Sequence, residues 1–234
     1  MQKVVGIIGG MGPLATVDLM SKIIFYTPAK KDQDHIHIIV DNYSQIPDRT
    51  TAILGKGTDP TPFMIQSARL LENAGADFLV MACNTAHFYF NAVSNSVSIP
   101  ILNMPLETAR FLHGNKLRRA GLLATDGTIN TKLYQHSCET YDIHVIEPDL
   151  QMQKEVMEGI YAIKAGNLDE GFLHLSEAAD KLRESGAEAI IAGCTEIPLV
   201  LKSSEQMNII DPTEILAKRV IETATETAKE LVEV

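Results

Sequence analysis

The strongest constraint on the fold of this chain is a stretch of sequence that occurs twice. Residues 75–85 (GADFLVMACNT) align without a gap, as far as the cysteine, to residues 186–196 (GAEAIIAGCTE), at an offset of 111 residues. Residues 5–12 resemble residues 120–127 at a similar offset of 115 residues. Because both pairs occur in the same order, the sequence predicts one structural unit that is present twice.

Each copy alternates short apolar runs with segments in which apolar residues recur near a spacing of 3.6 residues. This alternation predicts parallel strands with helices on both faces. Strands are expected at Val4–Ile8, Ile36–Val40, Phe78–Met81, Ile99–Leu102, Ala120–Ala124, Ile143–Ile146, Ala189–Ala192 and Asn208–Ile210. Helices are expected at Pro13–Thr27, Pro62–Ala74, Pro105–Leu112, Leu150–Ala165, Leu168–Ser185 and Pro212–Val234.

We therefore expect an α/β fold of two pseudo-symmetric lobes, each a mostly parallel sheet flanked by helices. The first lobe is expected at residues 1–103 and the second at 104–210, with the final helix, 211–234, packing back on the first. Ligands of open parallel sheets bind beyond the carboxyl ends of the strands. The active site is accordingly expected in the cleft between the lobes, where small-molecule pockets are common.

The charge and composition of the chain exclude some classes of binding partner. A formal net charge of −10, with no basic run and 6% aromatic residues, argues against binding to nucleic acid or to an anionic membrane. The N-terminal run, residues 1–10, is too short and too interrupted by glycine for a signal peptide or a membrane span. Three cysteines without a secretory signal suggest free thiols in a reducing cytoplasm.

Two of the three cysteines occupy corresponding positions of the repeat. Cys83 and Cys194 each follow an apolar strand and precede polar residues that are expected to begin a helix. Backbone N–H groups at a helix start lower the pKa of a thiol, so we expect thiolates near neutral pH. A single cysteine is more often a buried small hydrophobe, but matched positions favour a shared role. Cys138 has no counterpart and is expected to be inert packing.

A pair of thiols suits one kind of chemistry. Inverting an α-carbon requires a base that removes the proton from one face and an acid that delivers a proton to the other face. A thiolate and a thiol satisfy this requirement. Because their roles exchange with the direction of reaction, two residues of the same type are expected.

Five segments of the chain closely resemble motifs of the aspartate/glutamate racemase superfamily, and of its aspartate racemases in particular. The resemblance covers residues 3 to about 215, and the motifs occur in the family's order. The segments are Gly9–Pro13 (GGMGP), Pro47–Thr50 (PDRT), Cys83–His87 (CNTAH), Lys164–Leu168 (KAGNL) and Ala192–Glu196 (AGCTE).

The resemblance implies a pyridoxal-independent enzyme, usually a homodimer, in which Cys83 and Cys194 are the acid and the base. It also associates Arg49 and Lys164 with the carboxylates of the substrate. The physical chemistry agrees, since arginine offers a planar two-pronged donor to a carboxylate and lysine offers a point charge. Taken alone, Lys164 is more often an ordinary solvated cation, whereas for Arg49 the two interpretations are about equal. No cofactor is implied.

Further polar positions resemble residues of the family that hold the α-amino and α-carboxylate groups. Short hydroxyl and amide side chains beside exposed backbone N–H groups suit that task, although the same residues also serve as helix caps. These substrate-binding candidates are Met11, Gly12, Asn84, Thr85, Thr125, Thr128 and Thr195.

Glu196 departs from the glutamate racemases, which typically place a histidine at this position, and so favours the aspartate branch. Its carboxylate is a candidate to accept or relay the proton of Cys194. A structural hydrogen bond, or a favourable charge at a helix start, explains Glu196 almost as well. His87 lies on the first helical turn after Cys83 and is expected to be structural.

Other functions are less well supported. Cys83 and His87 lack the additional ligands of a metal site, so no metal is predicted. The turn Gly9–Gly12 lacks both the dinucleotide fingerprint and the Gly-Lys-Ser/Thr ending of a P-loop. The main prediction is interconversion of L- and D-aspartate. Glutamate, broad amino-acid or hydantoin racemisation, maleate isomerisation, and a two-lobe protein that only binds small anions remain as alternatives.

Overall fold

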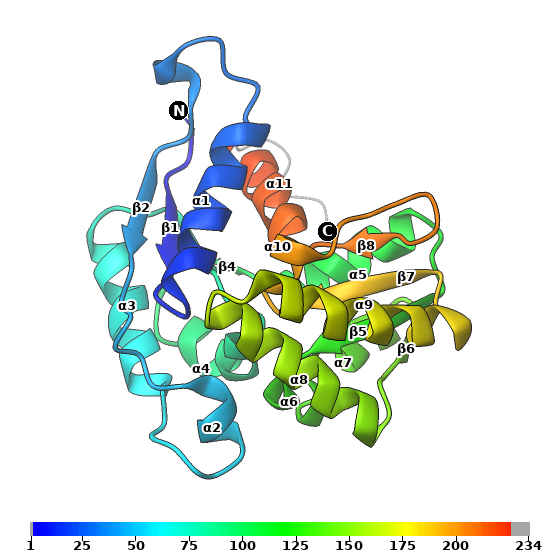
Figure 1. Ribbon diagram of the computed structural model, residues 1–234. Helices are drawn as coiled ribbons and strands as arrows, with labels where there is room; N and C mark the ends of the chain where they lie inside the picture. Colours follow the sequence, from blue (N-terminus) through cyan, green and yellow to red (C-terminus); the bar gives the residue numbers. More distant parts are fainter. Residues whose placement is uncertain (1, 226–234) are drawn as a thin grey trace. The chain divides into compact units, whose positions relative to one another are not determined.

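The computed structural model describes residues 2–225 and contains two four-stranded parallel sheets (Figure 1). The contacts within the chain divide it into two compact units. The first unit comprises the chain up to Asp48, Thr58–Met104 and the segment from Thr213. The second unit comprises Arg49–Gly57 and Pro105–Pro212. The lobe boundaries expected from the sequence remain predictions.

The sheet of the first unit has the strand order β2-β1-β3-β4, with every neighbouring pair parallel. Its strands are β1 (Val5–Ile8), β2 (Ile38–Asp41), β3 (Phe78–Met81) and β4 (Ile101–Leu102). Its helices are α1 (Pro13–Tyr26), α3 (Thr61–Asn73), α4 (Phe90–Ser94) and α11 (Pro212–Thr225), with the 3-10 helices η1 (Asp32–Asp34) and η2 (Thr85–Tyr89).

The sheet of the second unit has the equivalent order, β6-β5-β7-β8, and is also parallel throughout. Its strands are β5 (Arg119–Ala124), β6 (His144–Ile146), β7 (Ala189–Gly193) and β8 (Ile209–Ile210). Its helices are α2 (Arg49–Ile53), α5 (Met104–Gly114), α6 (Asp126–Asn130), α7 (Leu133–Glu139), α8 (Leu150–Lys164), α9 (Leu168–Glu184) and α10 (Ile197–Val200). The expected class of two parallel-sheet α/β lobes is confirmed.

The two units also share the way in which neighbouring strands pack against each other. A Cβ atom on Gly6 of β1 would lie 2.5 Å from Leu79 Cδ2 on β3. A Cβ atom on Gly121 of β5 would lie 2.7 Å from Ile190 Cδ1 on β7. Each glycine therefore accommodates a bulky side chain of the neighbouring strand, and those two side chains are aligned in the repeat.

An acidic side chain fixes the start of the first strand in each unit, β1 or β5. Asp77 Oδ2 accepts a hydrogen bond from the backbone N–H of Val4 at 2.6 Å. Glu188 Oε2 accepts from the N–H groups of Arg118 and Arg119 at 2.7 and 2.8 Å. The two carboxylates stand at equivalent positions of the repeat, so the duplication extends to single hydrogen bonds.

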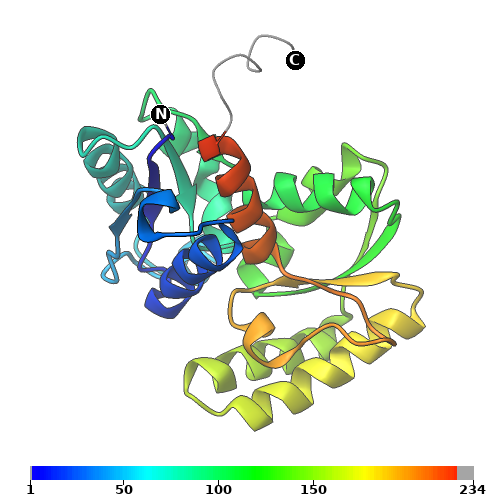
Figure 2. The ribbon, with the colours of Figure 1, turned by 90° about the horizontal axis from the view of Figure 1, so that it is seen from above.

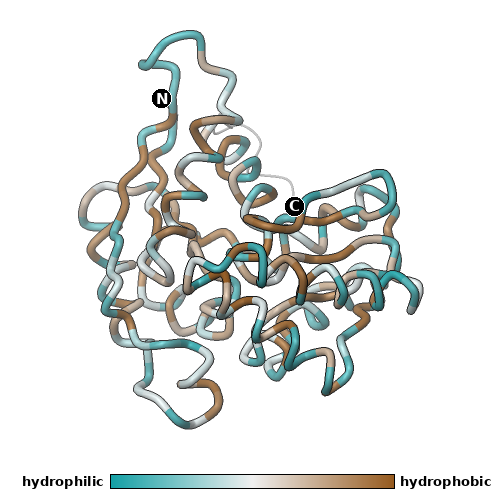
Figure 3. Tube along the Cα trace, in the orientation of Figure 1, coloured by the Kyte–Doolittle hydropathy of each residue, from teal (hydrophilic) through white to brown (hydrophobic). Residues whose placement is uncertain are grey.

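The apolar pattern explains where the cores form, because the strands are among the most hydrophobic parts of the chain (Figure 3). Helix α11 lies beside α1 in both views (Figures 1 and 2), and its Leu216 and Val220 share a core with Val5 and Leu19. The predicted final helix extends over residues 226–234, which lie outside the described residues. None of the helices within residues 2–225 is long and apolar enough to cross a bilayer.

All eight expected strands are present, with ends that differ from prediction by at most two residues. The long helices are present as well. The short helices α2, α4, α6 and α10 have five residues or fewer. Such helices are too short to display a 3.6-residue period, which explains why the sequence did not predict them.

Candidate functional site

Cys83 stands at the carboxyl end of the first sheet. It follows the fully buried strand β3, and its side chain is only 6% exposed. Because Ile8 of β1 pairs with Met81 of β3, the turn after β1 and Cys83 leave the same edge of the sheet. Met11 of that turn belongs to the same hydrophobic cluster as Cys83. The structure thus brings the first-unit candidates to one edge.

The turn Gly9–Gly12 is held in shape by Thr16 of α1. Thr16 Oγ1 accepts from the N–H of Gly10 at 2.9 Å and donates to the carbonyl of Gly12 at 3.1 Å. Gly10 has φ = 84°, and a Cβ atom there would lie 2.2 Å from the backbone of Tyr43. Only glycine fits this position. Nothing in the sequence pattern pointed to the role of Thr16.

Asn84 and Thr85, the polar candidates that follow Cys83, are both buried at the start of η2. His87 comes one turn later and uses both ring nitrogens within the fold. Its Nδ1 lies 2.8 Å from the carbonyl oxygen of Cys83, and its Nε2 accepts from the N–H of Met104 at 3.1 Å. Burial lowers the pKa of His87 to about 4. His87 is therefore a neutral structural residue, in agreement with the prediction.

This buried histidine should make the stability of the protein depend on pH. An unfolded histidine takes up its proton near pH 6.5, whereas folded His87 does so only near pH 4. The unfolded state binds more protons between these values, so stability should fall as the pH falls from about 6.5 to about 4, by about 3 kcal/mol from this residue. Urea denaturation of the wild type and of His87→Gln across that range measures the effect.

The variant should be less stable at neutral pH but should lose less further stability on acidification. His144→Gln, which removes an exposed histidine, is the matched control and should behave as the wild type. Equal acid sensitivity of all three proteins would contradict the role given to His87.

Cys194 stands at the carboxyl end of the second sheet, in a polar cluster. Its Sγ donates to Glu196 Oε2 at 2.9 Å, and Thr195 Oγ1 donates to the same oxygen at 3.2 Å. The other oxygen of Glu196 lies 3.9 Å from Lys164 Nζ, at the end of α8. Cys194 is 6% exposed, whereas the side chain of Lys164 is 41% exposed. The predicted assisting carboxylate therefore contacts the thiol directly.

The expected lowering of the thiol pKa at a helix start is wrong as a net result for Cys194, although the backbone N–H of Glu196 does lower that pKa. Burial raises its pKa well above the ordinary value, the negative charge of Glu196 raises it further, and Lys164 opposes these effects. Helix α10 begins only at Ile197 and has four residues. Its small dipole, three residues away, does not offset burial and a neighbouring carboxylate.

Removing the charge of Glu196 should therefore make the Cys194 thiolate easier to form. In Glu196→Gln the pH at which Cys194 reacts with iodoacetamide should shift downward, because the repelling charge is gone. The rate of alkylation at this cysteine, measured against pH by peptide mass spectrometry, tests the prediction. Glu205→Gln, at an exposed glutamate of the same unit, is the control. An unchanged or upward shift in Glu196→Gln would contradict the assignment.

Thr125 in the turn after β5 and Thr128 in the first turn of α6 are both buried. Thr125 is the N-cap of α6, and its hydroxyl oxygen accepts from the N–H of Thr128 at 3.3 Å. The capping role that the sequence left open is thus present. Arg49 begins α2, and α2 packs against α6.

The structure groups the predicted residues into two sets, one in each unit. The first unit holds Cys83 with Met11, Gly12, Asn84 and Thr85. The second unit holds Cys194 with Arg49, Thr125, Thr128, Lys164, Thr195 and Glu196.

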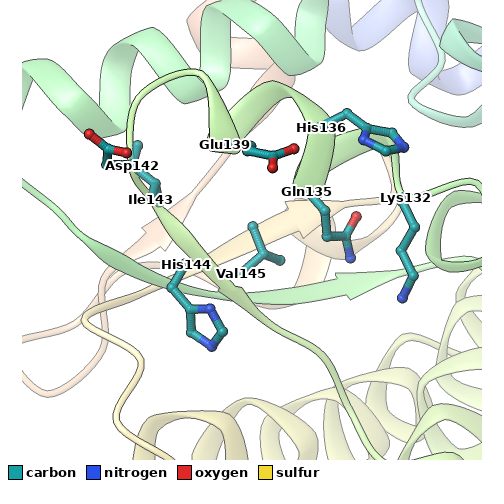
Figure 4. Close-up of a pocket in the computed structure, with 8 residues that line it drawn as sticks. All are labelled: Lys132, Gln135, His136, Glu139, Asp142, Ile143, His144 and Val145. Carbon is teal, nitrogen blue, oxygen red and sulfur yellow. The ribbon is translucent and has the colours of Figure 1, made fainter.

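Two other features of the second unit contain none of these residues. Glu155, Glu158 and His174 form the one group among residues 2–225 whose ligand atoms are close enough to hold a metal ion, within 4.8 Å of one another. His174 Nδ1 there already lies 2.8 Å from Glu155 Oε2. A surface pocket between α7 and β6 is shown in Figure 4. Its lining residues are Lys132, Gln135, His136, Glu139, Asp142, Ile143, His144 and Val145.

Comparison with known proteins gives a consistent result. A family model described as Asp/Glu/hydantoin racemase matches residues 8–220. A relative from Bacillus subtilis (strain 168), described as the broad specificity amino-acid racemase RacX, is 29% identical over 238 residues, which cover 94% of this chain and 97% of the relative.

Solved structures share the fold. The Picrophilus torridus aspartate racemase superimposes with a TM-score of 0.87 and 32% identity, over 98% of this chain and 97% of that one. A glutamate racemase from Francisella tularensis subsp. tularensis SCHU S4, solved with D-glutamate, gives a TM-score of 0.68 at 18% identity, over 94% of this chain and 80% of that one. The second likeness concerns the fold alone.

Proposed function

The chain belongs to the Asp/Glu/hydantoin racemase family, and we propose from this membership that it interconverts L- and D-aspartate, one of Cys83 and Cys194 removing the α-proton and the other delivering a proton to the opposite face. The observation that carries the proposal is the equivalence of the two thiols. Each follows an inner strand of a four-stranded sheet, β3 or β7, at the same position of a duplicated unit.

In the proposed reaction one cysteine is a thiolate and the other a thiol. The thiolate removes the α-proton from one face, which leaves a carbanion or enolate-like species, and the thiol then delivers its proton to the opposite face. The first cysteine ends as the thiol and the second as the thiolate. The next turnover in the reverse direction starts from that state, so the proton count balances without another reagent.

Glu196 is proposed to serve the Cys194 side of this exchange. Its contact with Sγ supports a role in holding the thiol proton when Cys194 acts as the acid. At the equivalent position of the repeat, two residues after Cys83, the chain has Thr85. The two thiols are therefore proposed to differ in their proton affinity.

Aspartate is proposed as the substrate because the two predicted cations, Arg49 and Lys164, match its two carboxylates in number and in charge. Lys164 lies close to the Cys194 cluster, and the helix that begins at Arg49 belongs to the same unit. Fixed cations and dipoles around the α-carboxylate stabilise the developing negative charge in a site that excludes water. The likeness to an aspartate racemase, 32% identical over nearly the whole chain, supports the same substrate.

Broad amino-acid racemisation is the second candidate, since the B. subtilis relative is described as a broad specificity racemase. Chiral chromatography after incubation with L-aspartate, L-glutamate and neutral L-amino acids, without added cofactor, separates the candidates. D-Aspartate alone is the expected product. Comparable turnover of many amino acids would overturn the aspartate assignment, and unchanged enantiomers throughout would overturn racemase activity in favour of a binding protein.

A homodimer and a cytoplasmic location belong to the same proposal. Light scattering coupled to size-exclusion chromatography should give about twice the chain mass of 25.7 kDa. A monomer with full activity would contradict the predicted assembly.

A further inference from the structure

Gln153 of α8 contacts the turn that carries Thr125, and no feature of the sequence indicated this. Its Nε2 donates to the carbonyl of Ala124 at 3.1 Å and to Asp126 Oδ1 at 2.8 Å. One helical turn later, Met157 Sδ accepts from the N–H of Asp126 at 3.3 Å. Helix α8 thus fixes the residues on both sides of Thr125.

The carbonyl that Gln153 binds lies one strand away from the second thiol. Ala124, the last residue of β5, pairs with Gly193 of β7, and Gly193 directly precedes Cys194. A Cβ atom on Gly193 would lie 3.0 Å from the Cβ of Ala124. Because the two strand ends are this tightly packed, a displacement of Ala124 displaces the backbone that carries Cys194.

The same contact also supports Arg49. Asp126 is the first residue of α6, and α6 is the helix against which α2 packs. Arg49 is the first residue of α2. A single amide group therefore fixes the start of the element that supports Arg49 and the end of the strand beside Cys194.

The side-chain amide of Gln153 is oriented so that its nitrogen donates two hydrogen bonds, whereas its oxygen accepts none within residues 2–225. Gln153 Oε1 is buried and has no hydrogen-bond partner among the described residues. A buried acceptor without a partner is unfavourable. This unfavourable orientation of the amide is explained by its two neighbours, because the carbonyl of Ala124 and the carboxylate of Asp126 are both acceptors and require one uncharged donor between them.

We propose that Gln153 is a positioning residue for the racemisation, acting through Ala124 on Cys194 and through α6 on Arg49. The inference rests on the proposed function. Its chemical requirement is a hydrogen-bond donor at position 153, since a carboxylate there would place three acceptors together with no hydrogen to share.

Gln153→Glu provides a test that separates positioning from simple destabilisation. When position 153 is ionised it repels Asp126, and the activity should fall roughly ten- to a hundredfold, as a displaced reacting group would cause. As the pH falls, repulsion between the two carboxylates causes one of them to take up a proton, which restores a donor. The ratio of variant to wild-type kcat/KM should therefore increase as the pH is lowered from about 8.5 to about 6.

Gln151→Glu makes the same substitution at an exposed position of the same helix, and its ratio should stay near one at every pH. Gln153→Met removes the donor without adding charge, so its activity should be lowered by a factor that does not change with pH. Thermal unfolding of each variant shows how much of it is folded at each pH, and the ratios are calculated per folded protein.

Full activity in both Gln153→Met and Gln153→Glu would overturn the inference. A loss in Gln153→Glu that is the same at every pH would overturn it as well, because a donor would then be unnecessary. If Gln153→Glu does not fold at high pH, the activity of Gln153→Met per folded protein is the test: lowered activity supports the inference and full activity overturns it. Absence of racemisation by the wild type itself would instead contradict the proposed function.

Discussion

Replacement of either proposed catalytic cysteine by alanine should abolish racemisation. Cys83→Ala lacks one of the two proton-transfer groups and Cys194→Ala lacks the other, and a positioned acid or base contributes roughly a hundred- to ten-thousandfold to rate. Each variant should therefore lose at least that factor in the conversion of L-aspartate to D-aspartate and in the reverse reaction. Polarimetry or chiral chromatography, in both directions, measures the loss.

The control is the third cysteine. Cys138 is fully buried, and its burial raises its pKa to about 12. Cys138→Ala should retain racemase activity per folded protein, with some loss of stability from the small cavity. Full racemisation by either Cys83→Ala or Cys194→Ala would show that the proposed two-thiol mechanism is wrong.

Cys83→Ala and Cys194→Ala should also differ from each other in the enantiomer that they deprotonate, and a loss of folding would not produce such a difference. An aspartate analogue with a leaving group on its β-carbon needs only removal of the α-proton before that group departs and a double bond forms. Each variant retains one of the two proposed catalytic thiols, and this thiol can reach the α-proton from one face only. Cys83→Ala and Cys194→Ala should thus eliminate opposite enantiomers. Elimination of the same enantiomer by both would contradict thiols on opposite faces of the substrate.

Loss of either predicted carboxylate-binding cation should give the next largest effect. Replacing Arg49 or Lys164 by methionine removes a charged hydrogen bond worth roughly 1.5 to 3 kcal/mol, so kcat/KM for aspartate should fall about ten- to a hundredfold. Arg49→Lys retains the charge but not the two-pronged geometry, and should fall between the wild type and Arg49→Met. Steady-state kinetics with L-aspartate and with D-aspartate measures each effect.

Lys154→Met is the matched control, since Lys154 is exposed on α8, the helix that ends at Lys164. Its kinetics should equal those of the wild type. Unchanged kinetics in both Arg49→Met and Lys164→Met would show that these cations do not bind the substrate, and the case for aspartate over a neutral amino acid would lose its physical basis.

The apolar pattern predicted the strands and the long helices, and the internal repeat predicted that Cys83 and Cys194 follow corresponding strands. Strands such as Phe78–Met81 are continuous apolar runs, and such runs form buried parallel strands whatever packs around them. Because parallel strands expose their carboxyl ends at one edge, the repeat alone also placed Cys83 and Cys194 at corresponding edges of their sheets. These inferences depend on local pattern and on the likeness of one half of the chain to the other.

Only the tertiary structure decided the environment of those thiols. The raised pKa of Cys194 depends on burial and on the orientation of Glu196, and the chain pattern alone had suggested the opposite direction. Thr16 and Gln153 were missed because their hydrogen bonds involve backbone groups that the surrounding fold brings to them. Likewise, α2 groups with the second unit although it lies among residues of the first in sequence. Hydrogen bonding, burial and packing between distant residues leave no periodic signal in a sequence, and they determine the chemistry of this site.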